Sequence, residues 1–386
     1  MEFSTKAIHV GQHPDTATGA VITPIYQTAT FAQDEIGVNK GYDYTRSGNP
    51  TRTALQECLA SLENGKYGLA FASGLAANTA VLSILKPGDN VVAMDDLYGG
   101  TYRLFEKVLT NLGITITYVD GTDTTAFKKA ITKQTKLIWL ETPTNPLLKI
   151  TDIKAISEIA KNNKVVLVVD NTFATPYFQQ PLNLGADIVV HSTTKYIGGH
   201  SDVVGGAAII NDDELNQKIS FYQNAAGAVP GPFDSWLTLR GLKTLSLRMN
   251  EHEKNAKYIA EALLDHPAIS SVNYPGLKSH PQYDLITKQM SGFGGMVSFN
   301  IKGGLKEANS LMKNLKFFTL AESLGGVESL ICYPPKMTHA AIPAEVREKR
   351  GITDSLVRIS VGIEDKDDLL NDLNSALNQI SKSISV

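Results

Sequence analysis

The chain has 386 residues, of which 42% are hydrophobic and 19% are charged, and its net charge is −3. This balance gives no basic excess for binding nucleic acid or a membrane surface, and the length predicts two domains. With only two cysteines, Cys58 and Cys332, a disulfide framework is not expected and a reducing compartment fits. The chain has no signal-like apolar start and no run long enough to span a bilayer, so we expect a cytoplasmic protein.

Residues 1–50, here called the N-terminal arm, lack the periodicity of a packed core. They contain turn-forming stretches such as HPDTATGA and SGNPTR. They also carry the aromatic residues Tyr26, Tyr42 and Tyr44, with Arg46 close behind. A long irregular segment rarely lies free on its own domain, and the aromatic content argues against a disordered tail. We therefore expect the arm to wrap a neighbouring subunit or to close over a site.

From Thr51 onward, helical and extended patterns alternate. Apolar spacing predicts helices over TRTALQECLASLE, TYRLFEKVLTNL and DIKAISEIAKNN. Short apolar runs predict strands at residues 65–71, 90–94, 114–119, 136–141, 165–170, 186–191 and 206–210. This alternation predicts an α/β fold, in which a mostly parallel sheet is covered by helices within a large domain over residues 51–240.

A second, smaller domain is expected over residues 241–386. A long helical region that begins near Trp236 forms the bridge to it, with Gly241 as a candidate interruption. Strands are predicted at 269–274, 295–301 and 356–361, and a last amphipathic helix at 366–380. The stretch AESLGGVESLICYPP is expected to be a loop beside the site. These elements predict an α+β domain.

The stretch from Ile188 to Asp202 carries the strongest chemical signal. A buried strand ends there and is followed by Ser192, Thr194 and Lys195, then by glycines. A residue just past a strand end lies where open α/β sheets bind ligands. Hydroxyls beside an amine suit a phosphorylated aldehyde, because the amine condenses with the carbonyl and the hydroxyls hold the phosphate. Since most lysines after strands are solvated loop residues, this interpretation needs support elsewhere.

Neighbouring strand ends supply that support. The strand over residues 165–169 leads into Asp170, and a carboxylate there can pair with a protonated pyridine nitrogen, as in pyridoxal phosphate (PLP) enzymes. The stretch 72–77 predicts a strand, a turn and a helix start, whose free N–H groups can bind an anion. Polar loops at 95–100, 141–146 and 170–172 are expected to converge with the lysine loop at the carboxyl edge of the sheet.

Several segments, in chain order, resemble the Cys/Met-metabolism family of PLP enzymes. The matching segments are YTRSGNPTR, FASGLA, MDDLYGGTYR, ETPTNP, VVDNTF, HSTTKYIGGHSDVVGG, GLKTLSLRM, LAESLGGVESL, MTHA and VRISVGIED. The resemblance covers essentially the whole chain. It implies the fold-type I architecture of PLP-dependent transferases, with a seven-stranded sheet. It also implies a homotetramer, a dimer of dimers with active sites shared between subunits.

The resemblance also implies roles for single residues around the cofactor. Lys195 would form the Schiff base and move protons, Asp170 would pair with the pyridinium nitrogen, and Tyr98 would stack on the ring and act as a catalytic acid. Thr172 would lie near the cofactor. The phosphate would be bound by Ser192, Thr194, the amides of Gly74 and Leu75, and Tyr44 and Arg46 from a neighbouring subunit.

For the substrate, the resemblance implies that Asn145 and Arg358 hold the α-carboxylate. Residues near the distal end of the substrate would be Glu322, Ser323 and Arg103. No metal is expected. The spacing of the three histidines nearest these motifs matches no zinc motif, so we interpret them as structural: His191, His200 and His339.

The activity expected from the resemblance is γ-elimination of cystathionine to cysteine, 2-oxobutyrate and ammonia. The segments AIHVGQ and VDNTF…PYFQ favour it over the alternative, γ-replacement of O-acetyl- or O-succinylhomoserine with cysteine. Gly100 replaces a cysteine of methionine-specialised relatives, which argues against methionine γ-elimination. A nicotinamide-dependent oxidoreductase is disfavoured because no G-x-G-x-x-G follows an early strand. Joint presence of Lys195, Asp170, Tyr98 and Arg358 argues against a non-catalytic binding protein.

Overall fold

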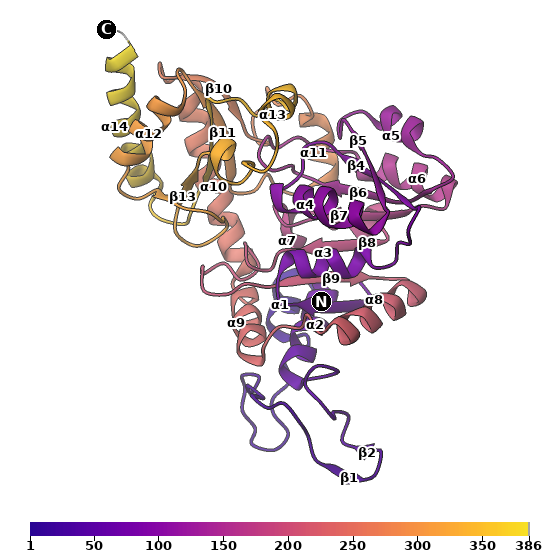
Figure 1. Ribbon diagram of the computed structural model, residues 1–386. Helices are drawn as coiled ribbons and strands as arrows, with labels where there is room; N and C mark the ends of the chain where they lie inside the picture. The colour runs from indigo at the N-terminus through magenta and orange to yellow at the C-terminus, as the bar shows by residue number, and fades with distance from the viewer. Residues whose placement is uncertain (385–386) are drawn as a thin grey trace.

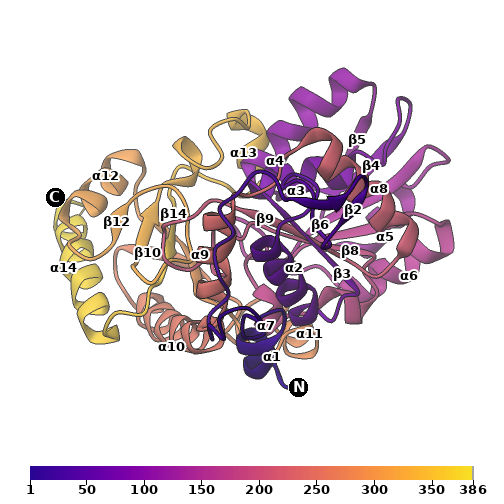
Figure 2. The same ribbon diagram turned by 90° about the horizontal axis from the view of Figure 1, so that it is seen from below.

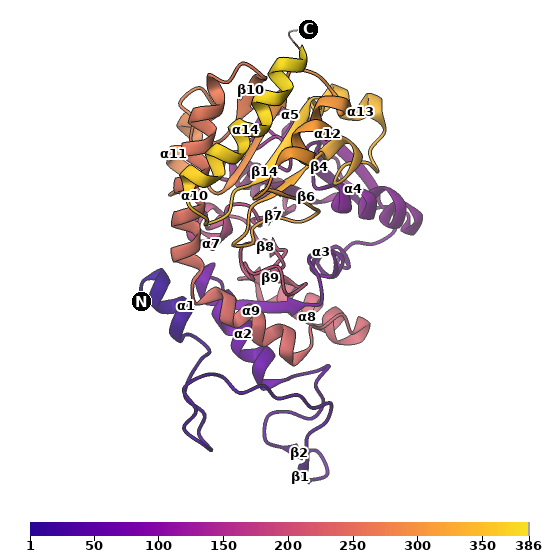
Figure 3. The ribbon, with the colours of Figure 1, turned by 90° about the vertical axis from the view of Figure 1, so that its left-hand side faces the viewer.

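The computed structural model describes residues 1–384 of the chain. The N-terminal arm runs outward from the body of the molecule and returns to it, as Figures 1 and 3 show. As expected it is mostly irregular, and its regular elements are helix α1 (Phe3–His9) and the short antiparallel pair β1 (Gln33–Glu35) and β2 (Val38–Asn39). Helix α1 packs against α2 (Pro50–Leu62), where Ala7 is buried. At seven residues, it is too short to give a clear sequence period.

The large sheet has seven strands, as expected, and all seven predicted strands are confirmed. Only β9 runs against its neighbours, so the sheet is mostly parallel. Most of its residues are buried because helices cover both faces. The strand order is β3 (Tyr67–Phe71), β9 (Gly206–Ile210), β8 (Ile188–His191), β7 (Val166–Asp170), β6 (Thr135–Glu141), β4 (Asn90–Met94), β5 (Thr115–Val119).

The helices of this region begin at clear capping signals. Asn49 accepts a hydrogen bond from Thr51 N–H at the start of α2, and Asp152 and Asp212 cap α6 and α8 in the same way. The helix predicted over 101–112 begins two residues earlier and then loosens into a π-turn over 105–109 and a 3₁₀ turn over 110–112. The helices are α3 (Gly74–Leu82), α4 (Gly99–Leu104), α5 (Thr124–Ala130), α6 (Ile153–Asn163), α7 (Thr175–Phe178) and α8 (Asp213–Ala226).

Two helices, α9 (Pro232–Leu242) and α10 (Leu245–Leu264), connect the large sheet to a second sheet, and Figure 2 shows them between the two. The interruption falls at residues 243–244 and not at Gly241, which lies inside α9. Glycine is needed there for a different reason: a Cβ at Gly241 would clash with the carbonyl oxygen of Gly198 in the lysine loop. The connecting helices therefore pack directly on that loop.

The second sheet has five strands. Three were predicted, but β12 and β13 were missed, and β13 lies inside the stretch that was expected to be a loop. At two and three residues, both are too short for a sequence period. The strand order is β10 (Ile269–Asn273), β11 (Met296–Ile301), β14 (Leu356–Ser360), β13 (Leu330–Cys332), β12 (Thr319–Leu320), and the helices are α11 (Tyr283–Gln289), α12 (Leu305–Asn314), α13 (Ala344–Arg350) and α14 (Lys366–Ile384).

One buried hydrophobic cluster joins the two parts of the molecule. It includes Leu55 of α2, Tyr196 of the lysine loop, Met249 of α10, Ile286 of α11 and Met296 of β11. The domain boundary expected near residue 240 stays a prediction, because the packing is continuous across it. Across residues 1–384, none of the helices has the length and apolar character needed to cross a membrane.

Candidate active site

A cavity of about 400 Å³ lies where the carboxyl ends of the large-sheet strands face the C-terminal part of the chain. The polar loops that were predicted to converge do so here, together with the start of α3. Segments near β13 and in β14 complete the wall. The predicted residues that line it are Gly74, Leu75, Tyr98, Asn145, Asp170, Thr172, Ser192, Thr194, Lys195, Glu322, Ser323 and Arg358.

Lys195 is held inside this cavity by a single side-chain partner. Its Nζ donates a hydrogen bond to Ser323 Oγ at 2.8 Å. Burial lowers the pKa of the amine to about 8, the Arg358 cation acts in the same direction, and Glu322 opposes them. A substantial fraction of the amine is therefore neutral near pH 8, which a nucleophile or a base requires.

Two carboxyl groups lie side by side at the ends of β6 and β7. Glu141 and Asp170 are paired in register across the two parallel strands, and burial raises the pKa of both. Asp170 Oδ1 accepts a hydrogen bond from Thr172 N–H at 3.0 Å. In the ion pairs found within residues 1–384, neither carboxyl has a cationic partner. A half-buried Asp170 that lines the cavity and has no cationic partner among the described residues fits a cationic ring nitrogen.

The start of α3, which also lines the cavity, is suited to binding an anion. Ser73 caps α3, its hydroxyl accepting from Ala76 N–H at 3.0 Å, whereas the N–H groups of Gly74 and Leu75 have no acceptor within the helix. A Cβ at Gly74 would lie 2.9 Å from Ser192 Cβ, so glycine allows the helix start to approach Ser192. These groups fit a phosphate, and with Asp170 and Lys195 they fit PLP.

Arg358 and Asn145, both of which are buried, meet at the cavity wall. Arg358 Nη1 donates to Asn145 Oδ1 at 2.7 Å, and its Nη2 donates to the Ser323 carbonyl at 3.0 Å. The Nε of Arg358 is buried without any partner among the described residues. An unsatisfied guanidinium N–H at a cavity wall is suited to a carboxylate ligand.

Tyr98 borders the cavity at the start of α4. Its N–H donates to Glu141 Oε2 at 2.9 Å, so the carboxyl fixes the backbone that carries the ring. Burial raises the pKa of the phenol, and Arg103 lowers it, so the phenol stays protonated at neutral pH. A Cβ on Gly100 would clash with the Tyr98 ring. Arg103 itself is exposed and is not part of the cavity wall, so it acts on this site only through its charge.

Two predicted phosphate contacts lie outside the cavity. Tyr44 is 47% exposed on the N-terminal arm, and the Arg46 guanidinium lies 5.6 Å from its ring centre. Arg46 Nε also donates to Asn224 Oδ1 at 3.3 Å. Their predicted role requires a neighbouring subunit, and it stays a prediction.

Other lining residues had no predicted role of their own. Glu141 and Ser73 lie in segments that were expected at the site, the loop 141–146 and the turn 72–77. Glu141 closes its strand as Asp170 closes the next one, and this equivalent position was a usable signal for a role. The lining residues without a predicted role are Ser73, Asn78, Glu141, Phe173, Val204, Leu324 and Thr338.

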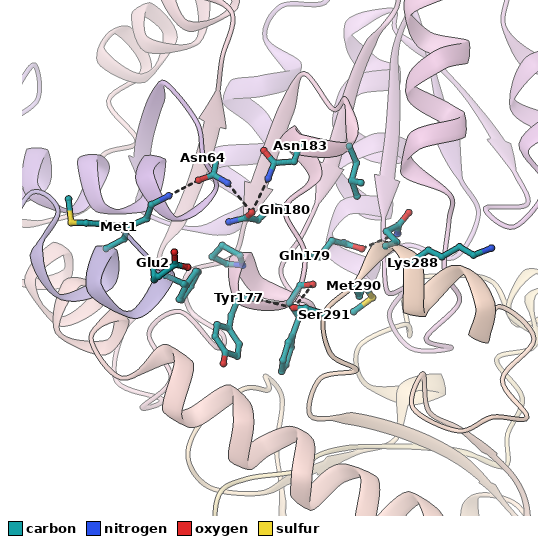
Figure 4. Close-up of a pocket in the computed structure, with 16 residues that line it drawn as sticks. Met1, Glu2, Asn64, Tyr177, Gln179, Gln180, Asn183, Lys288, Met290 and Ser291 are labelled. Atoms are coloured by element: carbon teal, nitrogen blue, oxygen red, sulfur yellow. Dashed lines mark hydrogen bonds between the residues drawn. The ribbon is translucent and has the colours of Figure 1, made fainter.

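A second hollow of about 550 Å³ lies between α1, α7 and α11 (Figure 4). Four of its polar side chains, those of Lys6, Asn64, Gln180 and Asn183, are already paired with one another. Lys6 Nζ donates to Asn64 Oδ1 at 2.6 Å, Asn64 Nδ2 donates to Gln180 Oε1 at 2.9 Å, and Asn183 Nδ2 donates to the same oxygen at 2.9 Å. Because these groups satisfy each other, the hollow is better explained as the joint between the arm and the body.

Comparison with known proteins agrees with this geometry. The model of the family described as Cys/Met metabolism PLP-dependent enzyme matches residues 4–378. A cystathionine gamma-lyase from Dictyostelium discoideum is 54% identical, with 98% of each chain covered, and a cystathionine gamma-synthase from Mycobacterium leprae is 56% identical, with 97% of each covered. The crystal structure of cystathionine gamma-lyase from Lactobacillus plantarum complexed with L-serine has a TM-score of 0.96 and 48% identity, covering 98% of this chain and 99% of that one. The chain belongs to the Cys/Met metabolism family of PLP-dependent enzymes.

Proposed function

We propose that the chain catalyses γ-elimination of L-cystathionine with water, giving L-cysteine, 2-oxobutyrate and ammonia. The observation that carries this proposal is the placement of Lys195 beside Arg358. One cavity holds an amine whose pKa is lowered to about 8 and a guanidinium with an unpaired N–H for a substrate carboxylate. This pairing suits the removal of a proton from the Cα of an amino acid.

The residues that would hold PLP are those of the sheet-edge wall. Lys195 would attach to its aldehyde carbon, Asp170 would face its ring nitrogen, and the phosphate would bind at the start of α3 near Ser192 and Thr194. Thr172, whose hydroxyl accepts from Ser192 N–H at 2.9 Å, would lie beside the ring. When bound, PLP supplies an electron sink that makes protons at Cα and Cβ of the substrate removable.

Different side chains of the protein would carry out the separate proton transfers. Arg358 and Asn145 orient the α-carboxylate, which directs the Cα proton toward Lys195. The neutral amine of Lys195 removes this proton and delivers protons at later positions. Tyr98, whose phenol stays protonated, donates to the departing sulfur. Glu322 in the same cavity would attract the ammonium group at the far end of cystathionine.

γ-Replacement by a cystathionine gamma-synthase is the second candidate, because a relative of that name is 56% identical. The two reactions share their steps until the γ-substituent leaves and differ in what happens next. A product assay distinguishes them. Fast release of 2-oxobutyrate and cysteine from cystathionine alone supports the proposal. Faster synthesis of cystathionine from cysteine and O-acetyl- or O-succinylhomoserine overturns it, and release of pyruvate and homocysteine overturns it in favour of β-elimination.

We also propose that the N-terminal arm completes the active site of a neighbouring subunit within a homotetramer. Apolar side chains exposed on the arm support this: Val21 is 81% exposed and Ile36 is fully exposed. Phe221 of α8, 74% exposed, adds a further apolar surface on the body. Such side chains are expected at subunit contacts.

Mixing two inactive variants tests the shared site. If Arg46 acts on the neighbour's phosphate, an Arg46→Ala protein and a Lys195→Ala protein will each be nearly inactive. Hybrids formed after subunit exchange will contain sites that carry neither change, and activity will return to about a quarter of wild type. No recovery in hybrids that are confirmed by mass spectrometry would contradict the proposal.

A further inference from the structure

His339 is a buried histidine that none of the steps above uses. It belongs to the MTHA segment, which follows the 3₁₀ turn over Pro334–Lys336, and its side chain is buried. Its Nε2 lies 2.9 Å from the carbonyl oxygen of Asn145, and its Nδ1 lies 2.7 Å from Thr338 Oγ1. The ring therefore links two segments that line the cavity, the loop after β6 and the turn that contains Thr338.

The contacts fix which ring nitrogen carries the proton. A carbonyl oxygen can only accept a hydrogen bond, so Nε2 must be the N–H donor to Asn145. Burial lowers the pKa of His339 to about 4, and the Arg358 cation acts in the same direction, so the ring is neutral at physiological pH. A neutral ring has one N–H, which leaves Nδ1 as an acceptor for the Thr338 hydroxyl.

On one side, this hydrogen bond completes the placement of Asn145. The N–H of Asn145 donates to Glu141 Oε1 at 3.1 Å, its carbonyl accepts from His339, and its Oδ1 accepts from Arg358. With these three groups occupied, the Nδ2 amide is the donor that remains for a ligand. Asn145 lines the same cavity as Arg358, whose Nε is unpaired among the described residues. His339 thus holds in place the loop that orients both donors.

On the other side, the ring sets the hydrogen-bonding character of Thr338. A hydroxyl has one hydrogen and two lone pairs, and here the hydrogen is donated to Nδ1. Thr338 Oγ1 can therefore offer only lone pairs to a ligand. Glu322 lies in the same cavity and is also an acceptor when ionised. Together they favour a substrate whose distal group is a hydrogen-bond donor, such as an ammonium.

We propose that His339 is a positioning residue that fixes the Asn145–Arg358 carboxylate site and makes the Thr338 wall selective for a distal ammonium group. The inference rests on the proposed function in one respect, since it assumes that the substrate is an amino acid held by its carboxylate at Arg358. It adds a specificity role to a histidine with no direct contact to the cofactor or to the reacting atoms.

Two substitutions separate the two hydrogen bonds of the ring. In His339→Gln, the side-chain amide can reach the Nε2 position and keep the donor to Asn145, but the acceptor for Thr338 is lost. In His339→Asn, the side-chain oxygen can take the Nδ1 position and keep the acceptor for Thr338, but the donor to Asn145 is lost. Thr338→Val leaves the ring intact and removes only the hydroxyl.

The first experiment tests the carboxylate site with L-alanine, which has a carboxylate but no γ-substituent to lose. Binding to each holoenzyme is followed by the change in visible absorption. We expect the Kd of alanine to rise about tenfold in His339→Asn and to stay within twofold of wild type in His339→Gln and Thr338→Val.

The second experiment tests selectivity for the distal group. It uses two substrates of equal length, S-(2-aminoethyl)-L-homocysteine and S-propyl-L-homocysteine, which differ by an ammonium in place of a methyl group. We expect wild type and His339→Asn to prefer the ammonium substrate by about tenfold in kcat/KM. In His339→Gln and Thr338→Val, the preference will fall to about twofold or less.

Equal effects of His339→Gln and His339→Asn in both experiments would overturn the inference, as would changes that follow only the Tm of the variants. A wild-type enzyme that binds alanine but leaves cystathionine unchanged would overturn the proposed function instead. In that case the Kd values for alanine still show whether the variants differ as expected, so the two failures are distinguishable.

Discussion

The two walls of the cavity are built differently. The sheet wall consists of the residues at the carboxyl ends of large-sheet strands and at the start of α3, among them Lys195 and Asp170. The C-terminal wall consists of Glu322, Ser323, Thr338 and Arg358, of which only Arg358 lies in a strand. The groups proposed to hold the cofactor thus lie in α3, in β7 or in loops that follow buried strands of the large sheet, whereas most groups proposed to select the substrate lie in irregular segments near the short strands β12 and β13. Irregular segments tolerate change better than a packed sheet, so the reaction can change while the cofactor site persists.

Replacing Lys195 by alanine is expected to have the largest effect, and it tests the sheet wall. Loss of both the nucleophilic amine and the general base should lower kcat by about 10⁴-fold. The visible absorption of the bound cofactor should change as well, and borohydride should no longer fix a pyridoxyl group to the peptide around residue 195. Lys288→Ala, at an exposed position on α11, is the matched control and should keep full activity. Unchanged turnover in the Lys195 variant would refute the assignment of the sheet wall.

Replacing Arg358 by glutamine tests the C-terminal wall. We expect kcat/KM for cystathionine to fall about 100-fold, because charged hydrogen bonds to the carboxylate are lost. The cofactor should remain bound with its colour retained. Arg240→Gln, at an exposed position of α9, should behave as wild type. If the Arg358 variant loses its cofactor as readily as its substrate, the two walls do not have separate roles.

Charged residues of the C-terminal wall also act on Lys195 of the sheet wall, whose pKa is lowered to about 8 from 10.5. Because only the neutral amine attacks an aldehyde, the rate of colour return after PLP is added to apoprotein should rise with pH and level off above about 8. Arg358 lowers this pKa, so Arg358→Gln should move the midpoint to higher pH. Glu322 raises it, so Glu322→Gln should move the midpoint to lower pH. Identical midpoints near 10 in all three proteins would contradict the assignment.

The sheet wall was predictable from the sequence for a physical reason. Each of its strands is a short apolar run that ends in polar residues, and parallel strands bring such ends to one edge. That was enough to find all seven strands and to place Asp170 and Lys195 together. Glu141 was placed in one of the converging loops but was given no role, although it occupies the same position at the end of its own strand as Asp170 does.

Two segments of the C-terminal wall were expected beside the site from their place in the chain, but the roles of Glu322, Ser323 and Arg358 came only from family resemblance. Ser323 has a left-handed backbone with φ of +85°, and β12 and β13 on either side of it are two and three residues long. Local sequence does not encode such geometry, because long-range contacts hold it: Lys195 and Arg358 both bond to Ser323.

Adding one methyl group at Gly100 should lower kcat less than the substitutions of Lys195 and Arg358 do. Gly100 lies beside Tyr98 in α4, and a Cβ there would clash with the phenol ring. The ring must therefore move, although Lys195, Asp170 and Arg358 stay in place. We expect Gly100→Ala to lower kcat about tenfold and to shift the cofactor absorption by a few nanometres, with little change in Tm.

Gly231→Ala is the matched control for this methyl group, because a Cβ at Gly231 would lie 3.7 Å from its nearest neighbour, Asp234 Oδ2. Tyr98→Phe distinguishes ring position from proton donation. If the phenol serves as the acid, Tyr98→Phe will lower kcat at least as much as Gly100→Ala but without the spectral shift. A Gly100→Ala enzyme with wild-type kcat and spectrum would mean that the Tyr98 ring can move without consequence, and that its position does not control catalysis.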